Sequence, residues 1–252
     1  MSDNAKKYSD VNYWNKRYES EDHFEWLGVG HEPLLDEMEH ILSSFPRDTP
    51  VLILGCGNSR LSVDLLHRGF TDILSTDYSR ICIQNQRAQF AHEPGLKWDV
   101  MDMTRIPLPD QSFSIVIEKA TIDGFLAHEP SPWRVGVEAK ELLDASLREI
   151  SRILKPHGRF LSVTFRQPHF RLPLMARMDL KWNVSFHEVL SPNSFHFYIY
   201  QMTKDQPLDL SGLEHFLRLG DASQNDNDYQ RVASSDSEDE DFVMSISSNI
   251  LT

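Results

Sequence analysis

The chain has 252 residues, of which 40% are hydrophobic and 10% aromatic, and its formal net charge is −13 at pH 7. This composition can form one large domain with a buried core, and the acidic charge argues against direct nucleic acid binding, because no dense run of Lys and Arg offsets it. Two cysteines cannot build a disulfide framework, and no apolar run approaches the roughly 18 residues of a membrane-spanning helix.

The first ten residues, MSDNAKKYSD, lack the apolar core of a secretory signal peptide. They also lack the Arg-rich, acid-poor character of a mitochondrial presequence. The low cysteine content suggests a reducing compartment. We therefore expect a cytoplasmic protein without a membrane partner.

Strand-like and helix-like segments alternate between residues 50 and 165. The apolar runs are typical of parallel strands that are buried on both faces, and the amphipathic runs between them are typical of helices. The predicted strands are 51–55, 71–77, 96–102, 113–119 and 158–165. The predicted helices are 59–69, 79–92 and 139–154.

Two β-rich runs, 181–190 and 194–204, follow and are separated by a short Ser-Pro-Asn turn. They predict an antiparallel hairpin at the edge of the sheet. The predicted fold class is therefore α/β, with a doubly wound, seven-stranded, mostly parallel sheet and a C-terminal antiparallel hairpin.

Residues 205–252 contain 11 acidic and 2 basic residues, a net charge of −9, whereas residues 1–204 carry only −4. Apolar periodicity fades here apart from a short predicted helix over 210–220, and the stretch SSDSEDEDF (234–242) is typical of disorder. We interpret 205–252 as an acidic, largely disordered tail. Its charge would suit a basic partner protein, or would only keep the segment solvated.

Three features fall at the carboxyl ends of successive predicted strands, where doubly wound sheets bind their ligands. The loop GCGNS begins at Gly55, Asp77 ends the second strand, and Asp102 ends the third. Glycines let a backbone approach a ligand closely, and the two carboxylates suit ribose hydroxyls and an adenine amine, with Met103 as an apolar neighbour. Arg60 occupies the position of the third glycine in a dinucleotide fingerprint, so the pattern favours an adenosine pocket over an NAD site.

The segments ILGCGNS, TDYS, WDVMDM and IEKATID resemble those of class I S-adenosylmethionine-dependent methyltransferases. More narrowly, YWNKRY, LGCGNS and EKATID are similar to the group of protein-lysine methyltransferases that act on translation elongation factor 1 alpha. The resemblance extends from about Tyr13 to Lys204 and includes the acidic tail. It implies S-adenosyl-L-methionine as cofactor and elongation factor 1 alpha as the protein substrate.

Carried over by position, the resemblance implies a cofactor-covering segment (residues 1–30) and a methyltransferase domain (31–204). Two residues depart from the family pattern: Ile53, where many class I enzymes have an acid, and Ala120, where relatives often have glycine. The change at Ala120 could alter the geometry of its loop. The implied cofactor-binding residues are Trp14, Tyr18, Trp26, Gly55, Asp77, Tyr78, Asp102, Met103 and Lys119.

Transfer of a methyl group to lysine requires the ammonium group to lose a proton first, and nearby carboxylates attract the cation. Glu118 and Asp123 flank the loop after the fourth strand, and we assign them to substrate orientation and proton acceptance. The alternatives are a buried ion pair of Glu118 with Lys119 or Arg159, and a helix-cap role for Asp123. The 11 His show no ligand spacing, so no metal site is predicted.

The sequence therefore predicts a protein-lysine N-methyltransferase. A small-molecule methyltransferase and a non-catalytic module that binds S-adenosylmethionine are the alternatives. An NAD(P)-dependent oxidoreductase is disfavoured by Arg60 and by the closing hairpin.

Overall fold

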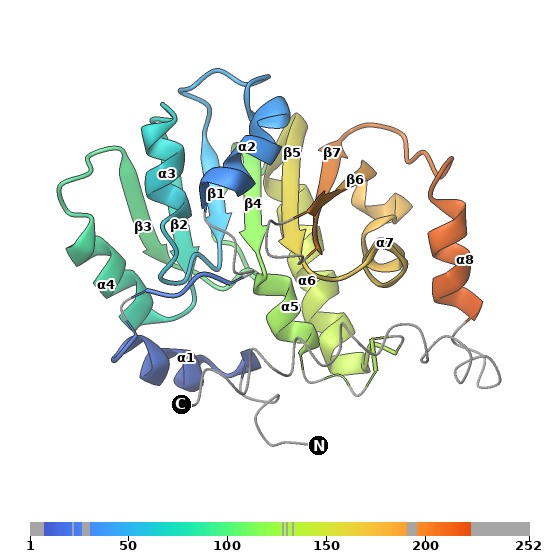
Figure 1. Ribbon diagram of the computed structural model, residues 1–252, viewed down its shortest axis with the longest axis horizontal. Helices are drawn as coiled ribbons and strands as arrows, with labels where there is room; N and C mark the ends of the chain where they lie inside the picture. Colours follow the sequence, from blue (N-terminus) through green and yellow to red (C-terminus); the bar gives the residue numbers. More distant parts are fainter. Residues whose placement is uncertain are drawn as a thin grey trace.

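The computed structural model describes residues 8–21, 23–26, 31–127, 129, 131–132, 134–190 and 196–222. These residues form a seven-stranded sheet with the order β3-β2-β1-β4-β5-β7-β6, and helices cover its faces (Figure 1). The strands are β1 (Val51–Leu54), β2 (Ile73–Asp77), β3 (Leu96–Val100), β4 (Phe113–Lys119), β5 (Leu154–Thr164), β6 (Trp182–Leu190) and β7 (His196–Lys204). The helices are α1 (Val11–Tyr18), α2 (His31–Leu42), α3 (Leu61–His67), α4 (Arg80–Gln89), α5 (Thr121–Leu126), α6 (Val137–Ile153), α7 (Pro168–Met175), η2 (Met178–Leu180, a 3-10 helix) and α8 (Glu214–Ala222).

The predicted fold class is confirmed by the pairing of the strands. Strands β1 to β5 pair in parallel, and β7 runs antiparallel to both of its neighbours, β5 and β6. The last two strands therefore form the predicted hairpin, with β6 outermost in the sheet. The Ser-Pro-Asn turn expected between them lies outside the described residues.

The direction in which the chain adds strands reverses at β1, whose neighbours are β2 and β4. In doubly wound sheets, ligands bind outside the carboxyl ends of the strands at such a switch point. Helices α1 and α5 both lie at this end of the sheet (Figure 1). The residues that follow β1, β2 and β4 are therefore the first candidates for a binding site.

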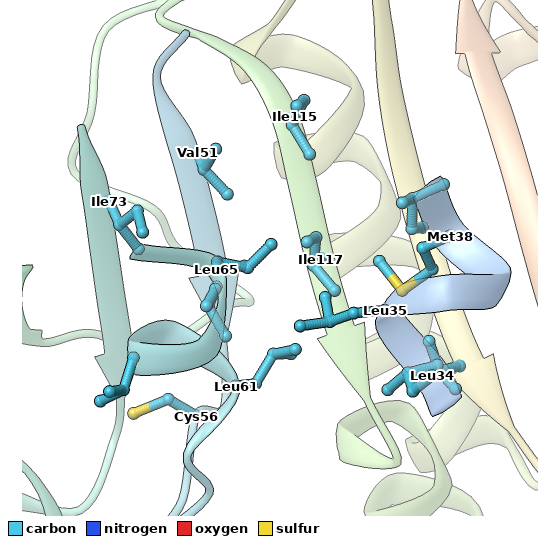
Figure 2. Close-up of a cluster of buried hydrophobic side chains, with 14 of the residues drawn as sticks. Leu34, Leu35, Met38, Val51, Cys56, Leu61, Leu65, Ile73, Ile115 and Ile117 are labelled. Carbon is cyan, nitrogen blue, oxygen red and sulfur yellow. The ribbon is translucent and has the colours of Figure 1, made fainter. Parts of the chain in front are cut away.

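Each face of the sheet has its own apolar core, because side chains alternate along a strand. In β1, Val51 and Ile53 belong to one core, and Leu52 and Leu54 belong to the other. Figure 2 shows the first of these cores, where Leu35 of α2 lies near the end of β4. The sheet is thus a rigid platform that fixes where each strand ends.

Helices α2, α5 and α7 are among the elements that the prediction does not contain. The apolar residues of α2 recur at helical spacing and are buried, so its pattern was readable from the sequence. By contrast, α5 has only six residues, and α7 contains an internal proline, Pro173, which disfavours a helix prediction. None of the helices in the described segments has the length and apolar character needed to cross a membrane.

The predicted acidic tail is only partly described. Helix α8 confirms the short helix expected over 210–220, with bounds shifted toward the C-terminus. Its Phe216 packs edge-to-face on Phe186 of β6, with ring centroids 5.4 Å apart. Residues 223–252, where disorder is predicted, lie outside the described residues.

Candidate active site

The loop after β1 approaches the start of α5 very closely. Gly55 and Gly57 have φ angles of 61° and 53°, in the left-handed region that favours glycine. A Cβ atom on Gly55 would lie 2.3 Å from the side chain of Thr121. The Thr121 hydroxyl donates hydrogen bonds to the carbonyl oxygens of Leu54 (3.1 Å) and Gly55 (3.2 Å). Gly55 is therefore required by its close approach to the Thr121 side chain and by its positive φ angle.

Asp77 joins the ends of β1 and β2. Its Oδ2 accepts a hydrogen bond from the Gly57 N–H (3.0 Å), and its Oδ1 accepts one from the Ser79 N–H (2.9 Å). The side chain is buried, and burial raises the pKa of Asp77 to about 6, although the backbone donors act in the opposite direction. Each carboxylate oxygen can accept two hydrogen bonds, so Asp77 can still accept from a ligand hydroxyl.

Asp102 and Met103 follow β3 at the same end of the sheet. Asp102 is exposed, and its Oδ1 accepts hydrogen bonds from the backbone N–H and the hydroxyl of Thr104, both at 2.8 Å. Met103 is buried beside it. Asp102 and Met103 therefore lie side by side, as predicted, in a turn that the hydrogen bonds of Asp102 stabilise.

An aromatic cap lies over the glycine loop. Trp14 stacks on Tyr18, with ring centroids 5.6 Å apart, and meets Trp26 at 5.9 Å. The Arg17 guanidinium lies over the ring of Trp26 at 5.2 Å, an arrangement in which the ring face attracts the cation. We define the aromatic cap as Tyr8, Tyr13, Trp14, Tyr18, Phe24 and Trp26.

Polar contacts join the segment that carries the aromatic cap (residues 8–26) to the loop after β1 and to the end of β4. The Asn58 side-chain amide donates to the Glu21 carbonyl (3.0 Å), and the hydroxyl of the buried Tyr18 lies 3.1 Å from where a Cβ atom on Gly57 would be. Lys119, at the end of β4, pairs with Glu25 at 3.1 Å, and both side chains are largely buried. Trp14, Tyr18 and Trp26, which are predicted to cover the cofactor, thus lie at the same end of the sheet as Lys119, another predicted cofactor-binding residue.

Tyr78 follows Asp77 and also contacts the cap. Its hydroxyl donates to the carbonyl oxygen of Tyr8 at 3.4 Å. Burial raises the pKa of the Tyr78 phenol, and the nearby Asp77 adds to this effect. Tyr78 therefore stays neutral and can act as a hydrogen-bond donor.

Glu118, near the end of β4, is completely buried. Its Oε2 accepts hydrogen bonds from the N–H groups of Thr121 (2.9 Å) and Ile122 (3.2 Å), and its Oε1 accepts one from the Ser162 hydroxyl. Burial raises the pKa of Glu118 to about 7, while Arg171 acts in the opposite direction. This geometry gives Glu118 a role in holding the start of α5.

The two ion pairs considered for Glu118 are not formed. Lys119 pairs with Glu25, and the Arg159 guanidinium donates to the His157 carbonyl oxygen. Successive side chains of a strand point to opposite faces of the sheet, so Lys119 does not share the environment of Glu118.

Asp123 lies in the first turn of α5 and is 23% exposed in its side chain. Its Oδ2 accepts a hydrogen bond from the Thr164 hydroxyl (2.6 Å), and its Oδ1 pairs with the buried Arg171. Of the two predicted catalytic carboxylates, only Asp123 combines partial exposure with a fixed orientation.

Ala120 stands at the point where the family pattern often has glycine, and it adopts φ 59° and ψ 11°. A non-glycine residue in this left-handed conformation is strained. The loop thus keeps the backbone that glycine would favour, and the Cβ atom of Ala120 adds strain instead of changing the path of the chain.

Comparisons with known proteins agree with this architecture. A family model described as a methyltransferase domain matches residues 52–162. EEF1A lysine methyltransferase 4 from Mus musculus is 38% identical over 212 residues, which cover 82% of this chain and 80% of the relative. The chain belongs to the EEF1A lysine methyltransferase 4 family.

Two further proteins are similar to this chain. The eEF1A lysine and N-terminal methyltransferase of Bos taurus is 30% identical over 84% of this chain, which corresponds to 31% of that longer protein. The N-methyltransferase NodS from Bradyrhizobium japonicum, solved with S-adenosyl-L-homocysteine, has a TM-score of 0.58 at 10% identity, over 79% of this chain and 99% of NodS. The second likeness concerns the fold alone.

The protein is therefore an enzyme that uses S-adenosylmethionine, as the sequence predicts, and its strand-end residues suit that cofactor. Asp77 has acceptor capacity for ribose hydroxyls, and the positive φ angles of Gly55 and Gly57 open the loop backbone to a ligand. The contacts of the individual cofactor-binding residues stay a prediction.

Sequence reasoning missed several residues of the site. Thr121 and Arg171 are adjacent to the predicted catalytic pair, and Glu25 neutralises Lys119. Thr121 lies inside the quoted EKATID motif, so its place beside Glu118 was a usable signal. Arg171 and Glu25 had no such signal, because their partners are 48 and 94 positions away in the chain.

One group of side chains in the described part of the chain has the proximity of a metal site. The ligand atoms of Cys56, Asp77 and Cys82 all lie within 4.8 Å of one another and are buried. Burial and the nearby Asp77 raise the pKa of Cys56, and contact with Cys56 and burial raise the pKa of Cys82. Both thiols are therefore protonated at neutral pH and fill space as small apolar groups. The absence of a metal site stays a prediction.

We expect a Gly55→Ala substitution to lower the free energy of unfolding, because the new Cβ atom meets Thr121 and the φ angle favours glycine. A Thr121→Ala substitution in the same chain should recover part of the loss, since it removes the two nearest atoms. Urea unfolding of both single variants and the double variant gives the coupling between the sites. Additive effects would contradict the proposed contact.

Replacing Ala120 by glycine should raise the free energy of unfolding by about 1 kcal/mol, because the left-handed strain is removed. Ala88→Gly is a matched control, since Ala88 is exposed within α4 and its replacement should lower stability by about 1 kcal/mol. Urea unfolding measures both changes. Destabilisation by Ala120→Gly would show that the loop conformation is not strained.

The buried Glu118 should make stability depend on pH. Its pKa in the folded protein is about 7, above the ordinary value of 4.5, so its contribution to stability is fully present below pH 4.5 and is lost as the pH rises through 7. Between pH 5 and pH 8 the wild-type protein should lose about 2–3 kcal/mol relative to Glu118→Gln. Urea unfolding at both pH values tests this, and parallel pH curves for the two proteins would refute it.

Proposed function

We propose that the protein transfers a methyl group from S-adenosylmethionine to a lysine side chain of translation elongation factor 1 alpha. The observation that carries this proposal is the 38% identity with EEF1A lysine methyltransferase 4 over 80% of that relative. The substrate named for that relative implies a cytoplasmic place of action for this chain, in agreement with the expectation from its sequence.

The site supports this proposal through its division into two parts. The glycine loop, Asp77 and the aromatic cap form one part, which suits an adenosyl group. The loop after β4, with Asp123 in its first helical turn, forms the other. Both lie at the carboxyl end of the sheet, so a methyl donor held by the first part is close to an acceptor held by the second.

The cofactor supplies the methyl group, and the protein must orient the acceptor and remove its proton. A free lysine ammonium has a pKa near ~10.4, so deprotonation is a requirement for attack. We assign this task to Asp123, whose side chain is partly exposed and held on both oxygens. A carboxylate there attracts the ammonium group and accepts its proton, directly or through water.

Glu118 contributes differently in this proposal. All the hydrogen bonds of its carboxylate go to the protein itself, at Thr121, Ile122 and Ser162. It fixes the first turn of α5 and with it the position of Asp123. Its expected part in substrate orientation is therefore indirect.

Transfer of radiolabelled methyl groups from S-adenosylmethionine to purified elongation factor 1 alpha tests the function. We expect label in the protein that disappears when one substrate lysine is replaced. The Asp77→Ala variant should lose cofactor binding and activity together. Cofactor binding without any transfer to the purified protein, or label that enters only small molecules or RNA when a cell lysate is the acceptor, would contradict the proposal.

Asp123→Asn should lower kcat by about 100-fold or more, the usual contribution of a positioned acid or base. Its dissociation constant for S-adenosylmethionine, measured by calorimetry, should match that of the wild type. Asp36→Asn is the matched control, because Asp36 is exposed on α2 and its carboxylate pairs with Arg68. Full turnover by Asp123→Asn would remove Asp123 from the mechanism.

A further inference from the structure

Arg171, in α7, is a fully buried arginine that contacts residues at the carboxyl ends of the strands. A buried guanidinium is costly unless it is paired with a carboxylate and hydrogen-bonded. Its Nη2 donates to Asp123 Oδ1 and to the Thr164 hydroxyl oxygen (2.9 Å). All the hydrogen bonds that Arg171 forms with described side chains therefore converge on one carboxylate and on the threonine beside it.

Thr164 closes these contacts into a ring. Its hydroxyl donates to Asp123 Oδ2 at 2.6 Å and accepts from Arg171. The three residues come from the first turn of α5, the end of β5 and the middle of α7. Asp123 is thus held on both oxygens from the interior side, while its side chain keeps 23% exposure toward the exterior.

The charge of Arg171 acts on both carboxylates of the site. It lowers the pKa of the buried Glu118, whereas Asp123 and burial raise it. Arg166 also lies near Asp123, with its Nε 3.9 Å from Oδ1, but its side chain is partly exposed. Arg171 is therefore a buried cation that offsets part of the repulsion between Glu118 and Asp123.

We propose that Arg171 is a positioning residue for methyl transfer, which together with Thr164 holds the Asp123 carboxylate oriented toward the substrate lysine. This inference rests on the proposed function and assigns a further residue to the same site. The planar guanidinium suits this task, because its Nη2 alone contacts both Asp123 and Thr164, and the plane of the group fixes the direction of the Nη2 N–H bonds. Lysine would retain the charge but not the planar geometry.

Kinetics of Arg171→Met, Arg171→Lys and Asp123→Asn, alone and combined, test the role. We expect Arg171→Met to lower kcat at least tenfold while the dissociation constant for S-adenosylmethionine stays within twofold of wild type. Arg171→Lys should recover part of the lost kcat. In the Asp123→Asn background, Arg171→Met should cause no further loss, because the group that it positions is already gone.

Arg177→Met is the matched control, since Arg177 forms ion pairs with Asp144 and Asp179 close to the end of α7. It should alter stability without altering kcat. If Arg171→Met does not fold, Thr164→Val replaces it, because this variant breaks the ring and leaves every charge in place. The same loss of kcat, again absent in the Asp123→Asn background, is expected.

Two results would overturn the inference. One is a wild-type kcat in a folded Arg171→Met or Thr164→Val protein. The other is an equal loss of kcat with and without Asp123, which would show that Arg171 acts only through the general stability of the fold. Failure of the wild-type protein to methylate elongation factor 1 alpha would instead overturn the proposed function, so the two failures are distinguishable.

Discussion

The carboxylate of Asp77 is the contact on which the cofactor end of the molecule depends. It binds the N–H groups of Gly57 and Ser79, and so ties the loop after β1 to the start of α4. The loop must then pass close to α5, where Thr121 leaves no space for a side chain on Gly55. Tyr18 lies over the same loop beside Gly57, so the aromatic cap takes its position from this arrangement.

Glu118 repeats this arrangement on β4. It is a buried carboxylate near a strand end that binds the N–H groups of the following turn. Strands β2 and β4, which lie on either side of β1, thus each use an interior acid to fix the backbone that follows, and burial raises the pKa of both acids. Of the two predicted catalytic acids, Asp123 is the one that we assign to proton acceptance, because it lies in the first turn of α5 and is partly exposed.

The strands and the strand-end residues could be predicted, because short apolar runs and the acids that follow them are local patterns. Asp77 ends such a run, and its place beside the switch point at β1 follows from the strand order. The partners of the site could not be predicted in the same way. The pair of Lys119 with Glu25 and the pair of Asp123 with Arg171 join distant segments, and no local periodicity encodes such contacts.

A crystal structure of the protein with S-adenosyl-L-homocysteine tests most directly whether Asp77 and the aromatic cap enclose the adenosyl group. We predict that the ribose hydroxyls lie within hydrogen-bonding distance of the Asp77 carboxylate, that the adenine lies beside Met103, and that the aromatic cap is closed over the ligand. A ligand bound elsewhere, or an Asp77 that contacts only Gly57 and Ser79, would contradict it.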